Sequence, residues 1–214
     1  MLIDDSLQKA QHQTMKYILE SNIYVEHLSR RIDASMEDFE EFWKVSDTIE
    51  STPNPMNRKY MIRRKQGTYG AQYNFGGQQS KIISSNYEEY PEIIKMVLDD
   101  VRTLSGSDAY NVCHVNFYPD GSAGLAPHSD NEKAMIHDMP IYSYTFISES
   151  GNPRGFQIYD KDSVEIHNIM LDNGDMVVMS AGMQKNYKHG VKKSMAKKFK
   201  SLRRINVTVR AWKQ

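Results

Sequence analysis

The feature that most constrains the fold of this 214-residue chain is a series of short β-rich runs that fills its second half. From residue 110 onward these runs are separated by turn sequences: Pro-Asp-Gly at 119–121, Ser-Gly-Asn-Pro at 150–153, Asp-Lys-Asp at 160–162 and Asp-Asn-Gly at 172–174. Short strands that alternate with turns in this way are typical of β architectures that pack or close on themselves. We therefore predict an α+β fold whose core is a double-stranded β-helix, or jelly roll.

The last of these runs, residues 204–211, has two chemically different faces because side chains alternate along a strand. The polar face comprises Arg204, Asn206, Thr208 and Arg210, and the apolar face comprises Ile205, Val207, Val209 and Ala211. A wet polar face is ordinary in antiparallel sheets, but this one carries two arginines and no acid. Since guanidinium groups bind carboxylates bidentately, the pattern favours a pocket for a small dicarboxylic acid.

A His-X-Asp triplet formed by His128 and Asp130 is followed much later by His189. On a strand the first two side chains point to the same side. Two imidazoles and one carboxylate on one side of an ion form the facial triad of non-haem Fe(II) oxygenases, which leaves positions for a co-substrate and dioxygen. A lone His-X-Asp is common by chance, so the arginine-bearing run adds weight to it. We predict that His128, Asp130 and His189 bind iron and carry the catalysis.

The run from Tyr110 to Tyr118 places Asn116 and Tyr118 on one face, directly before a turn. An amide and a phenol are thus expected to line the same cavity. His114 shares this face and is the main rival for the metal, although we expect it to be a hydrogen-bonded interior residue.

The motifs occur in the order Asn-X-Tyr-X-X-Gly, His-X-Asp, a distant His and Arg-X-Asn-X-Thr-X-Arg. In this order they resemble the AlkB family of 2-oxoglutarate- and Fe(II)-dependent dioxygenases, across residues 60–212. The resemblance implies that Fe(II), 2-oxoglutarate and dioxygen are used, with the far carboxylate of 2-oxoglutarate held by Arg204 and Tyr118. The other implied pocket residues are Asn116, Asn206, Thr208 and Arg210. Which arginine meets which carboxylate is left open.

The same resemblance implies oxidative dealkylation of N-alkylated nucleobases in DNA or RNA, with succinate, carbon dioxide and formaldehyde as products. Upstream of the iron motif, the chain is similar to the substrate-facing loop of the branch that repairs alkylated duplex DNA. Tyr73 and Phe75 share one face, and a base lifted from its stack needs an aromatic platform. The resemblance implies that Phe75 stacks on the base opposite His128, with Tyr73, Arg64 and Gln66 as further contacts. The alternative is that these aromatic rings are hairpin core.

The sequence departs from the family directly after Asp130, where the repair branch usually has an acid and this chain has Asn131 and then Glu132. We include Asn131 and Glu132 among the substrate-binding residues. An amide hydrogen bonds a base edge but does not pair with a cationic methylated base, so a preference for cationic lesions is in doubt. The turn before Arg154 is also longer than in the family, which leaves the role of Arg154 open.

Helices are expected mainly in the first half of the chain. Residues 7–20 look helical, and Ser35 followed by Asp38 resembles a cap that opens a second helix. A third helix begins at Pro91, and its apolar stripe is expected to pack against a sheet. That stripe comprises Ile94, Val97, Leu98, Val101 and Leu104. We predict one domain over residues 1–214: a helical N-terminal extension (1–57), nucleotide-recognition loops (58–90) and a helix plus the jelly-roll catalytic core (91–214).

Formal net charge is zero, but positive charge gathers between Lys185 and Arg204, where there is no acid. Such a run is either a solvated loop or a rim that contacts phosphates and positions a nucleic acid without reading its sequence. The single Cys113 permits no internal disulfide and is expected to be buried. No apolar run approaches the ~18 residues of a membrane span, and the first residues carry acids where a signal peptide needs cations. We expect an intracellular monomer of the cytoplasm or nucleus with no membrane partner.

Two other functions remain open. One is a nucleic-acid-binding protein whose iron site is structural or inactive, and release of succinate would distinguish it from an enzyme. The other is an oxygenase of the same fold that acts on protein or lipid, which has no need of an aromatic platform or a basic run.

Overall fold

The structure is a computed structural model that describes residues 13–54, 57–71, 74–75 and 78–213, and at 74–75 and 78–79 it describes the backbone alone. Its α-helices are α1 (Met36–Lys44), α2 (Glu92–Ser105) and α3 (Met183–Asn186), with 3-10 turns at Val45–Thr48, Tyr87–Glu89 and Lys197–Phe199. None of the described helices is long and apolar enough to cross a membrane.

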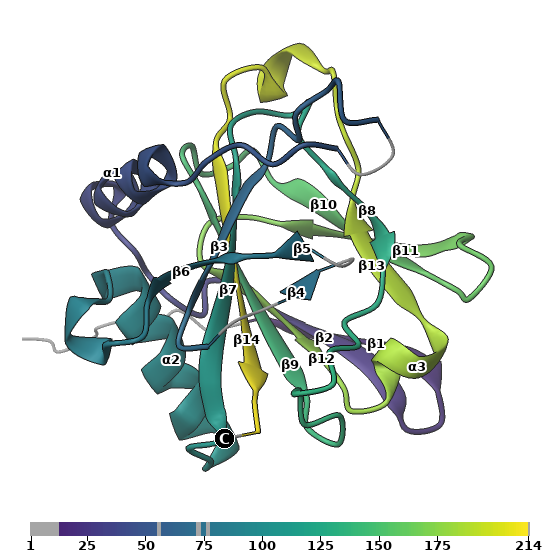
Figure 1. The fold of residues 1–214 in the computed structure, drawn as a ribbon. Coiled ribbons are helices and arrows are strands. Elements are labelled where there is room, and N and C mark those ends of the chain that lie inside the picture. Colours follow the sequence, from purple (N-terminus) through teal and green to yellow (C-terminus); the bar gives the residue numbers. More distant parts are fainter. Residues whose placement is uncertain (1–12, 55–56, 72–73, 76–77, 214) are drawn as a thin grey trace, which may run out of the picture.

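Two β-sheets make up the body of the molecule (Figure 1). The eight-stranded sheet has the order β1 (Thr14–Glu20), β2 (Ile23–Leu28), β12 (Asp175–Met179), β9 (Ile141–Ile147), β14 (Arg204–Ala211), β7 (Tyr110–Tyr118), β3 (Lys65–Tyr69) and β6 (Lys81–Ser84). The four-stranded sheet has the order β11 (Glu165–Leu171), β10 (Arg154–Tyr159), β13 (Lys188–Val191) and β8 (Leu125–His128). A separate pair joins β4 (Asn74–Phe75) and β5 (Gln78–Gln79).

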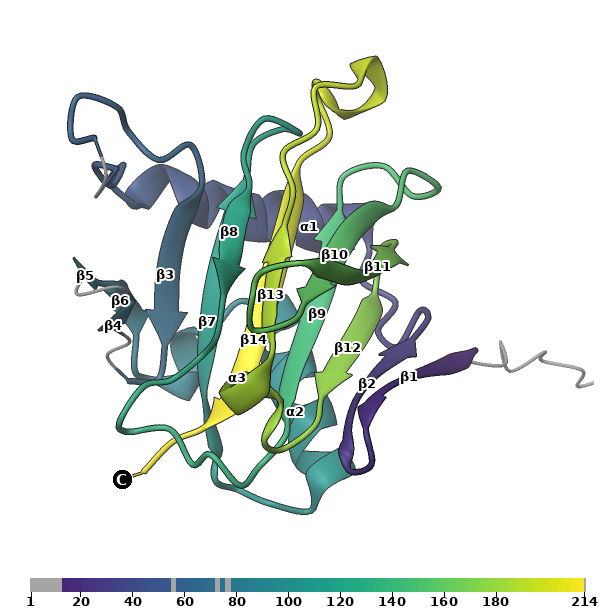
Figure 2. The ribbon, with the colours of Figure 1, turned by 90° about the vertical axis from the view of Figure 1, so that its right-hand side faces the viewer.

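Figure 2 shows the small sheet in front of the large one, with α1 and α2 on the far side. Neighbouring strands of both sheets are antiparallel, except that β3 and β6 are parallel. Two facing sheets of this kind are the predicted jelly roll, which is confirmed. The space between the sheets is therefore the place where side chains of β8, β13, β7 and β14 meet.

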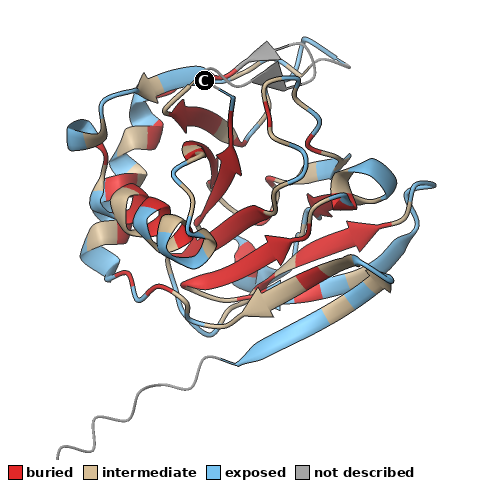
Figure 3. Cartoon of the chain, turned by 90° about the horizontal axis from the view of Figure 1, so that it is seen from below, coloured by how far each residue is buried: buried red, intermediate tan, exposed pale blue. Residues whose placement is uncertain are grey.

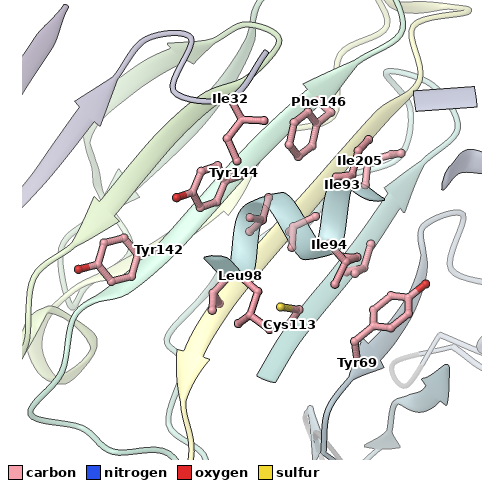
Figure 4. Close-up of a cluster of buried hydrophobic side chains, with 14 of the residues drawn as sticks. Ile32, Tyr69, Ile93, Ile94, Leu98, Cys113, Tyr142, Tyr144, Phe146 and Ile205 are labelled. Atoms are coloured by element: carbon pink, nitrogen blue, oxygen red, sulfur yellow. The ribbon is translucent and has the colours of Figure 1, made fainter. Parts of the chain in front are cut away.

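The main hydrophobic core lies between α2 and the outer face of the large sheet (Figure 4). Ile93, Ile94 and Leu98 of α2 pack there against Cys113 of β7 and Ile205 of β14. Burial raises the pKa of the Cys113 thiol to about 12, as suits an inert core residue. The predicted stripe is confirmed except at its last position, because Leu104 is 43% exposed near the end of the helix.

Alternation along β14 is confirmed. Its apolar side chains join the core under α2, whereas Asn206, Thr208 and Arg210 line a cavity together with residues of the small sheet. All eight residues of the strand are buried, so the alternative of a wet polar face is wrong. A second apolar cluster, which includes Phe156, Ile158 and Val177, fills the rest of the space between the sheets.

The N-terminal segment differs from the prediction. Residues 14–20 form an edge strand paired with β2 rather than a helix, and residues 7–12 lie outside the described part. Figure 3 shows β1 as a largely exposed strand at the edge of the sheet. The two-residue turn after Glu20 lets the chain fold back, with Tyr17 opposite Val25. The segment 1–57 is thus only partly helical, since β1 and β2 belong to the large sheet.

The second expected helix is confirmed as α1. Ser35 accepts a hydrogen bond from the backbone N–H of Asp38, and the Asp38 carboxylate accepts one from the Ser35 backbone, which is a complete capping box. Residues 65–69, expected within loops or hairpins, form β3 beside β7 and so bring the flanking side chains to the edge of the inner cavity.

Candidate metal and co-substrate site

Strand pairing brings the three predicted metal ligands together. His189 on β13 is the register partner of His128 on β8, and their ring centroids are 4.3 Å apart. Asp130 lies two residues beyond the end of β8. One donor atom from each of the three residues lies within 4.8 Å of the others. This separation suits donors that share one ion, and two imidazoles with a carboxylate are a donor set for Fe(II).

The carboxylate of Asp130 is held by Arg210. The Nε and Nη2 atoms of Arg210 donate to Asp130 Oδ2 at 3.0 and 2.6 Å. The other oxygen, Oδ1, lies 3.6 Å from His128 Nε2. The backbone N–H of Asp130 also donates to Gln184 Oε1 at 2.9 Å. One oxygen is therefore engaged by Arg210, and the other faces the imidazoles as a metal ligand needs to.

The protonation states suit a divalent cation. Burial lowers the pKa of His128, and it lowers that of His189 to about 3, helped by the neighbouring His128. Burial alone would raise the pKa of Asp130, but Arg210 and the two histidines outweigh it and leave that pKa below its usual value. Neutral imidazoles and an ionised carboxylate are the forms that bind metals.

At the other end of β14, Arg204 is a buried cation that lacks an anion in the described part of the chain. It is 0% exposed, and burial lowers the pKa of its guanidinium to about 10. Nη2 donates to the neutral Thr145 hydroxyl at 2.9 Å, while Nε and Nη1 have no hydrogen-bond partner among the described residues. A charge in the interior is stable only when paired. The site therefore fits a ligand that brings a carboxylate.

Two further polar groups support this fit. The Tyr118 hydroxyl and Asn116 Oδ1 are buried and have no hydrogen-bond partner among the described residues. The Tyr118 ring lies 5.3 Å from the Arg204 guanidinium carbon. A phenol that can donate beside a guanidinium suits a carboxylate oxygen. Both residues line the cavity that also contains His128 and His189.

Asn206 and Thr208 line the same cavity but are hydrogen bonded within the sheet. Asn206 Nδ2 donates to Ser143 Oγ and to the Tyr144 carbonyl, each at 2.8 Å. Thr208 Oγ1 donates to Asn206 Oδ1 at 3.2 Å. These bonds fix the floor of the cavity, and direct contact of either side chain with the co-substrate stays a prediction. Direct contact of Arg210 with the co-substrate also stays a prediction, because Arg210 lines the cavity but its guanidinium binds Asp130.

The predicted substrate residues fall into two groups. Arg64, just before β3, and Gln66, on β3, are buried and line the cavity that contains His128 and His189, called the metal cavity below. Tyr73 lies outside the described residues, and for Phe75 only the backbone is described. Asn131 is exposed and lines a different cavity beside Gln184, and Glu132 accepts a hydrogen bond from the Asn131 backbone. Contact of either residue with a base stays a prediction.

His114, the rival ligand, lies on β7 opposite Thr208 and lines the cavity. Among the described residues, however, the group close enough to share an ion comprises His128, Asp130 and His189. The pKa of His114 lies well below its usual value, mainly because the side chain is buried. His114 is therefore a neutral interior residue.

Three supporting residues were not assigned a role from the sequence. Arg154 donates to the backbone carbonyls of Asp120, Gly121, Ala123 and Lys192, and so ties the turn before β8 to the end of β13. Phe156 stacks on His189, with ring centroids 5.5 Å apart. Gln184 holds the backbone of Asp130 from a four-residue helix. Arg154 and Phe156 form an Arg-X-Phe sequence directly after the long turn, whereas no sequence signal marked Gln184.

The basic run has a divided environment. Lys192 pairs with Glu165, and Arg203 pairs with Glu40. Lys192 and Lys193 also line a groove that includes His128. Part of the run is thus neutralised by acids, and part lies beside the mouth of the metal cavity.

Comparisons with known proteins agree with this geometry. A family model described as the 2OG-Fe(II) oxygenase superfamily matches residues 14–210. The chain is 27% identical over 143 residues to the DNA oxidative demethylase ALKBH2 of Mus musculus, which covers 62% of this chain and 56% of that protein. Identity to the protein of the same name from Bos taurus is 26% over 165 residues, or 71% of this chain and 54% of that protein. The chain thus spans about half the length of the curated relatives it matches.

Two solved structures share the fold. The structure titled OsALKBH1 superposes with a TM-score of 0.55 at 18% identity, covering 87% of this chain and 97% of that one. A Pseudomonas putida prolyl-4-hydroxylase gives a TM-score of 0.52 at 15% identity, covering 89% and 92%. At these identities the likeness concerns the fold alone.

Proposed function

Because the chain belongs to the 2OG-Fe(II) oxygenase superfamily, we propose that this AlkB-like dioxygenase removes alkyl groups from the nitrogen atoms of nucleobases in DNA or RNA. One observation carries the proposal: the cavity lined by His128 and His189 of the His-Asp-His group is also lined by Tyr118. The Tyr118 ring lies 5.3 Å from the guanidinium carbon of the buried Arg204, which lacks an anion among the described residues. The relatives named DNA oxidative demethylase support a nucleic-acid substrate.

The proposed reaction consumes dioxygen, 2-oxoglutarate and the alkylated base. One oxygen atom enters 2-oxoglutarate, which loses carbon dioxide and becomes succinate, and the other enters a C–H bond of the N-methyl group. The N-hydroxymethyl base then releases formaldehyde and regains its N–H. Bound Fe(II) and 2-oxoglutarate supply the electrons and the site for reduction of dioxygen.

The protein residues would have separate tasks. His128, Asp130 and His189 would hold the iron from one side, and Arg210 would keep the Asp130 carboxylate ionised and oriented. Arg204 would bind the far carboxylate of 2-oxoglutarate with help from the Tyr118 hydroxyl. All of these side chains come from paired strands or the residues next to them, so the site is held rigidly before the ligands arrive.

The substrate side lies toward the groove lined by Arg63, Lys192 and Lys193. Cations at the mouth would contact phosphates and position the nucleic acid without reading its sequence. The proposed aromatic platform of Tyr73 and Phe75 would hold the extruded base.

The test is to incubate the Fe(II) protein with 2-oxoglutarate and a panel of N-methylated DNA and RNA oligonucleotides. We expect loss of a methyl group by mass from at least one oligonucleotide, together with release of succinate. His128→Ala should abolish both, whereas His137→Ala, which alters an exposed histidine, should retain both. Succinate without any methyl loss would refute the nucleobase substrate, and iron binding without succinate would favour a structural iron site.

The platform has its own test in Phe75→Ala. If Phe75 stacks on the base, methyl removal should fall far more than the turnover of 2-oxoglutarate measured without nucleic acid. An equal loss of both activities would indicate that Phe75 is part of the hydrophobic core instead.

A further inference from the structure

We propose that the cavity selects neutral N-alkylated bases that carry a carbonyl oxygen beside the alkylated nitrogen, such as N3-methylthymine or N1-methylguanine. Cationic lesions such as N3-methylcytosine and N1-methyladenine would be poorer substrates. This inference rests on the proposed function and specifies its substrate class.

The first observation is the charge of Arg64. This residue is 5% exposed, and it lines both the metal cavity and the neighbouring groove that contains His128. No carboxylate of the described residues lies within ion-pair distance of its guanidinium, which donates to the Gly124 carbonyl at 3.3 Å and to Gln66. A base stacked on His128 would meet this positive charge in a partly dry site, where repulsion between like charges is strong.

The second observation is the orientation of the Gln66 amide. Arg64 Nη2 donates to Gln66 Oε1 at 2.8 Å. A guanidinium has only donors, so Gln66 must turn its oxygen toward Arg64, which leaves its NH2 group for the rest of the cavity. Both residues therefore present donors. Donors bind the carbonyl oxygens of thymine and guanine, whereas adenine and cytosine present amino groups at the same edge.

The third observation is the absence of acids. The described residues that line the cavity and the groove include no Asp or Glu. The carboxylate of the neighbouring Asp130 already pairs with Arg210. Sequence extends this to the segment that the structure describes incompletely, because residues 51–87 contain no Asp or Glu. The same segment contains Arg58, Lys59, Arg63, Arg64, Lys65 and Lys81. Nothing in it would balance the charge of a cationic base.

The test compares four oligonucleotides of one sequence that carry N3-methylthymine, N1-methylguanine, N3-methylcytosine or N1-methyladenine. With the Fe(II) protein and 2-oxoglutarate, we expect kcat/KM for the neutral bases to exceed that for the cationic bases by at least about tenfold. Faster repair of the cationic bases would overturn this inference and leave the proposed function standing. No methyl loss from any oligonucleotide would overturn both.

Gln66→Glu sharpens the test, because it keeps the side-chain shape, removes the NH2 donor and adds a negative charge beside Arg64. The ratio of neutral to cationic repair should fall by at least about tenfold, and Arg64→Met should lower it in the same direction. Arg58→Met is the matched control, since it removes an exposed arginine of the same acid-free segment and should leave the ratio unchanged. An unchanged ratio in a Gln66→Glu protein that is folded by circular dichroism would overturn the inference.

Discussion

Arg204 and Arg210 stand at opposite ends of one polar face of β14, and both are almost fully buried. Arg210 is balanced by the protein itself, through its ion pair with Asp130. Arg204 has a neutral hydroxyl as its hydrogen-bond partner among the described residues. Identical residues on one strand thus have different environments. In the proposed function, Arg210 orients a metal ligand and Arg204 binds a carboxylate of 2-oxoglutarate.

This difference has a thermodynamic consequence. A buried ion pair that loses one member leaves an uncompensated charge, which is strongly destabilising. The pair of Arg210 and Asp130 is complete in the free protein, whereas Arg204 carries that unfavourable charge until a ligand binds. We expect the two ends of β14 to respond in opposite ways to mutation and to ligand.

The largest effect is expected for Asp130→Ala, which removes a metal ligand and leaves the Arg210 charge without its carboxylate. Succinate formation should fall below detection, and the free energy of unfolding should drop by about 3–5 kcal/mol. Denaturant unfolding and succinate assays measure the two losses. His128→Ala is the comparison: it should lose activity with a smaller loss of stability, because no buried ion pair is broken. Equal destabilisation by the two variants would contradict the role of Arg210.

The two arginines can be compared directly by replacing each with methionine. Arg204→Met should weaken the binding of 2-oxoglutarate about 100-fold or more, which corresponds to roughly 2.7 kcal/mol. The free energy of unfolding of the ligand-free protein should stay the same or rise, because a buried charge is removed. Arg210→Met should instead destabilise the ligand-free protein by about 3–5 kcal/mol. Titration with 2-oxoglutarate and denaturant unfolding of both variants would show whether the signs differ as expected.

The two arginines also show what the sequence reveals and what it conceals. Strand alternation placed Arg204 to Arg210 on one face, and it placed Asn116 beside Tyr118, because the side-chain period of a strand is a local property. The His-X-Asp spacing was also informative, but β8 ends at His128, so contacts with Arg210 and Gln184 hold Asp130 in place. The partner of Arg210 was not predictable, since Asp130 comes from a distant part of the chain and its approach depends on how β8 ends.

Other differences have the same origin. Residues 14–20 were predicted as a helix and form β1, because pairing with β2 outweighs local preference. Alternation extended past His128 also did not show that Asn131 would line a different cavity, because β8 ends at His128. The donor pair of Arg64 and Gln66 emerged only when register placed Gln66 opposite Asn116. Local periodicity was thus sufficient for the faces of strands but not for the partners across them.

Ligand binding offers a third test of the two ends of β14. If 2-oxoglutarate neutralises Arg204, the co-substrate with a non-reactive divalent metal should raise stability by about 2.7 kcal/mol at 100 times its dissociation constant. Thermal unfolding with and without the ligand measures this gain. In Arg204→Met the gain should fall to about 0.4 kcal/mol or less at the same concentration, because binding is about 100-fold weaker. A gain that persists in full would mean that another cation holds the carboxylate.

The smallest expected effect concerns nucleic-acid binding by two surface lysines. One of them forms an ion pair with a carboxylate, and the other does not pair with any carboxylate of the described residues. Lys192 pairs with Glu165, whereas no carboxylate of the described residues lies within ion-pair distance of Lys193, and both line the groove beside His128. Lys193→Glu should therefore weaken nucleic-acid binding several-fold and reduce the slope of log affinity against log salt by about one. Lys192→Glu should have a weaker effect on both quantities, because that lysine is already partly neutralised. Binding titrations at several salt concentrations with one unmodified oligonucleotide would measure both slopes. Equal effects of the two substitutions would show that pairing with Glu165 does not decide which lysine contacts phosphate.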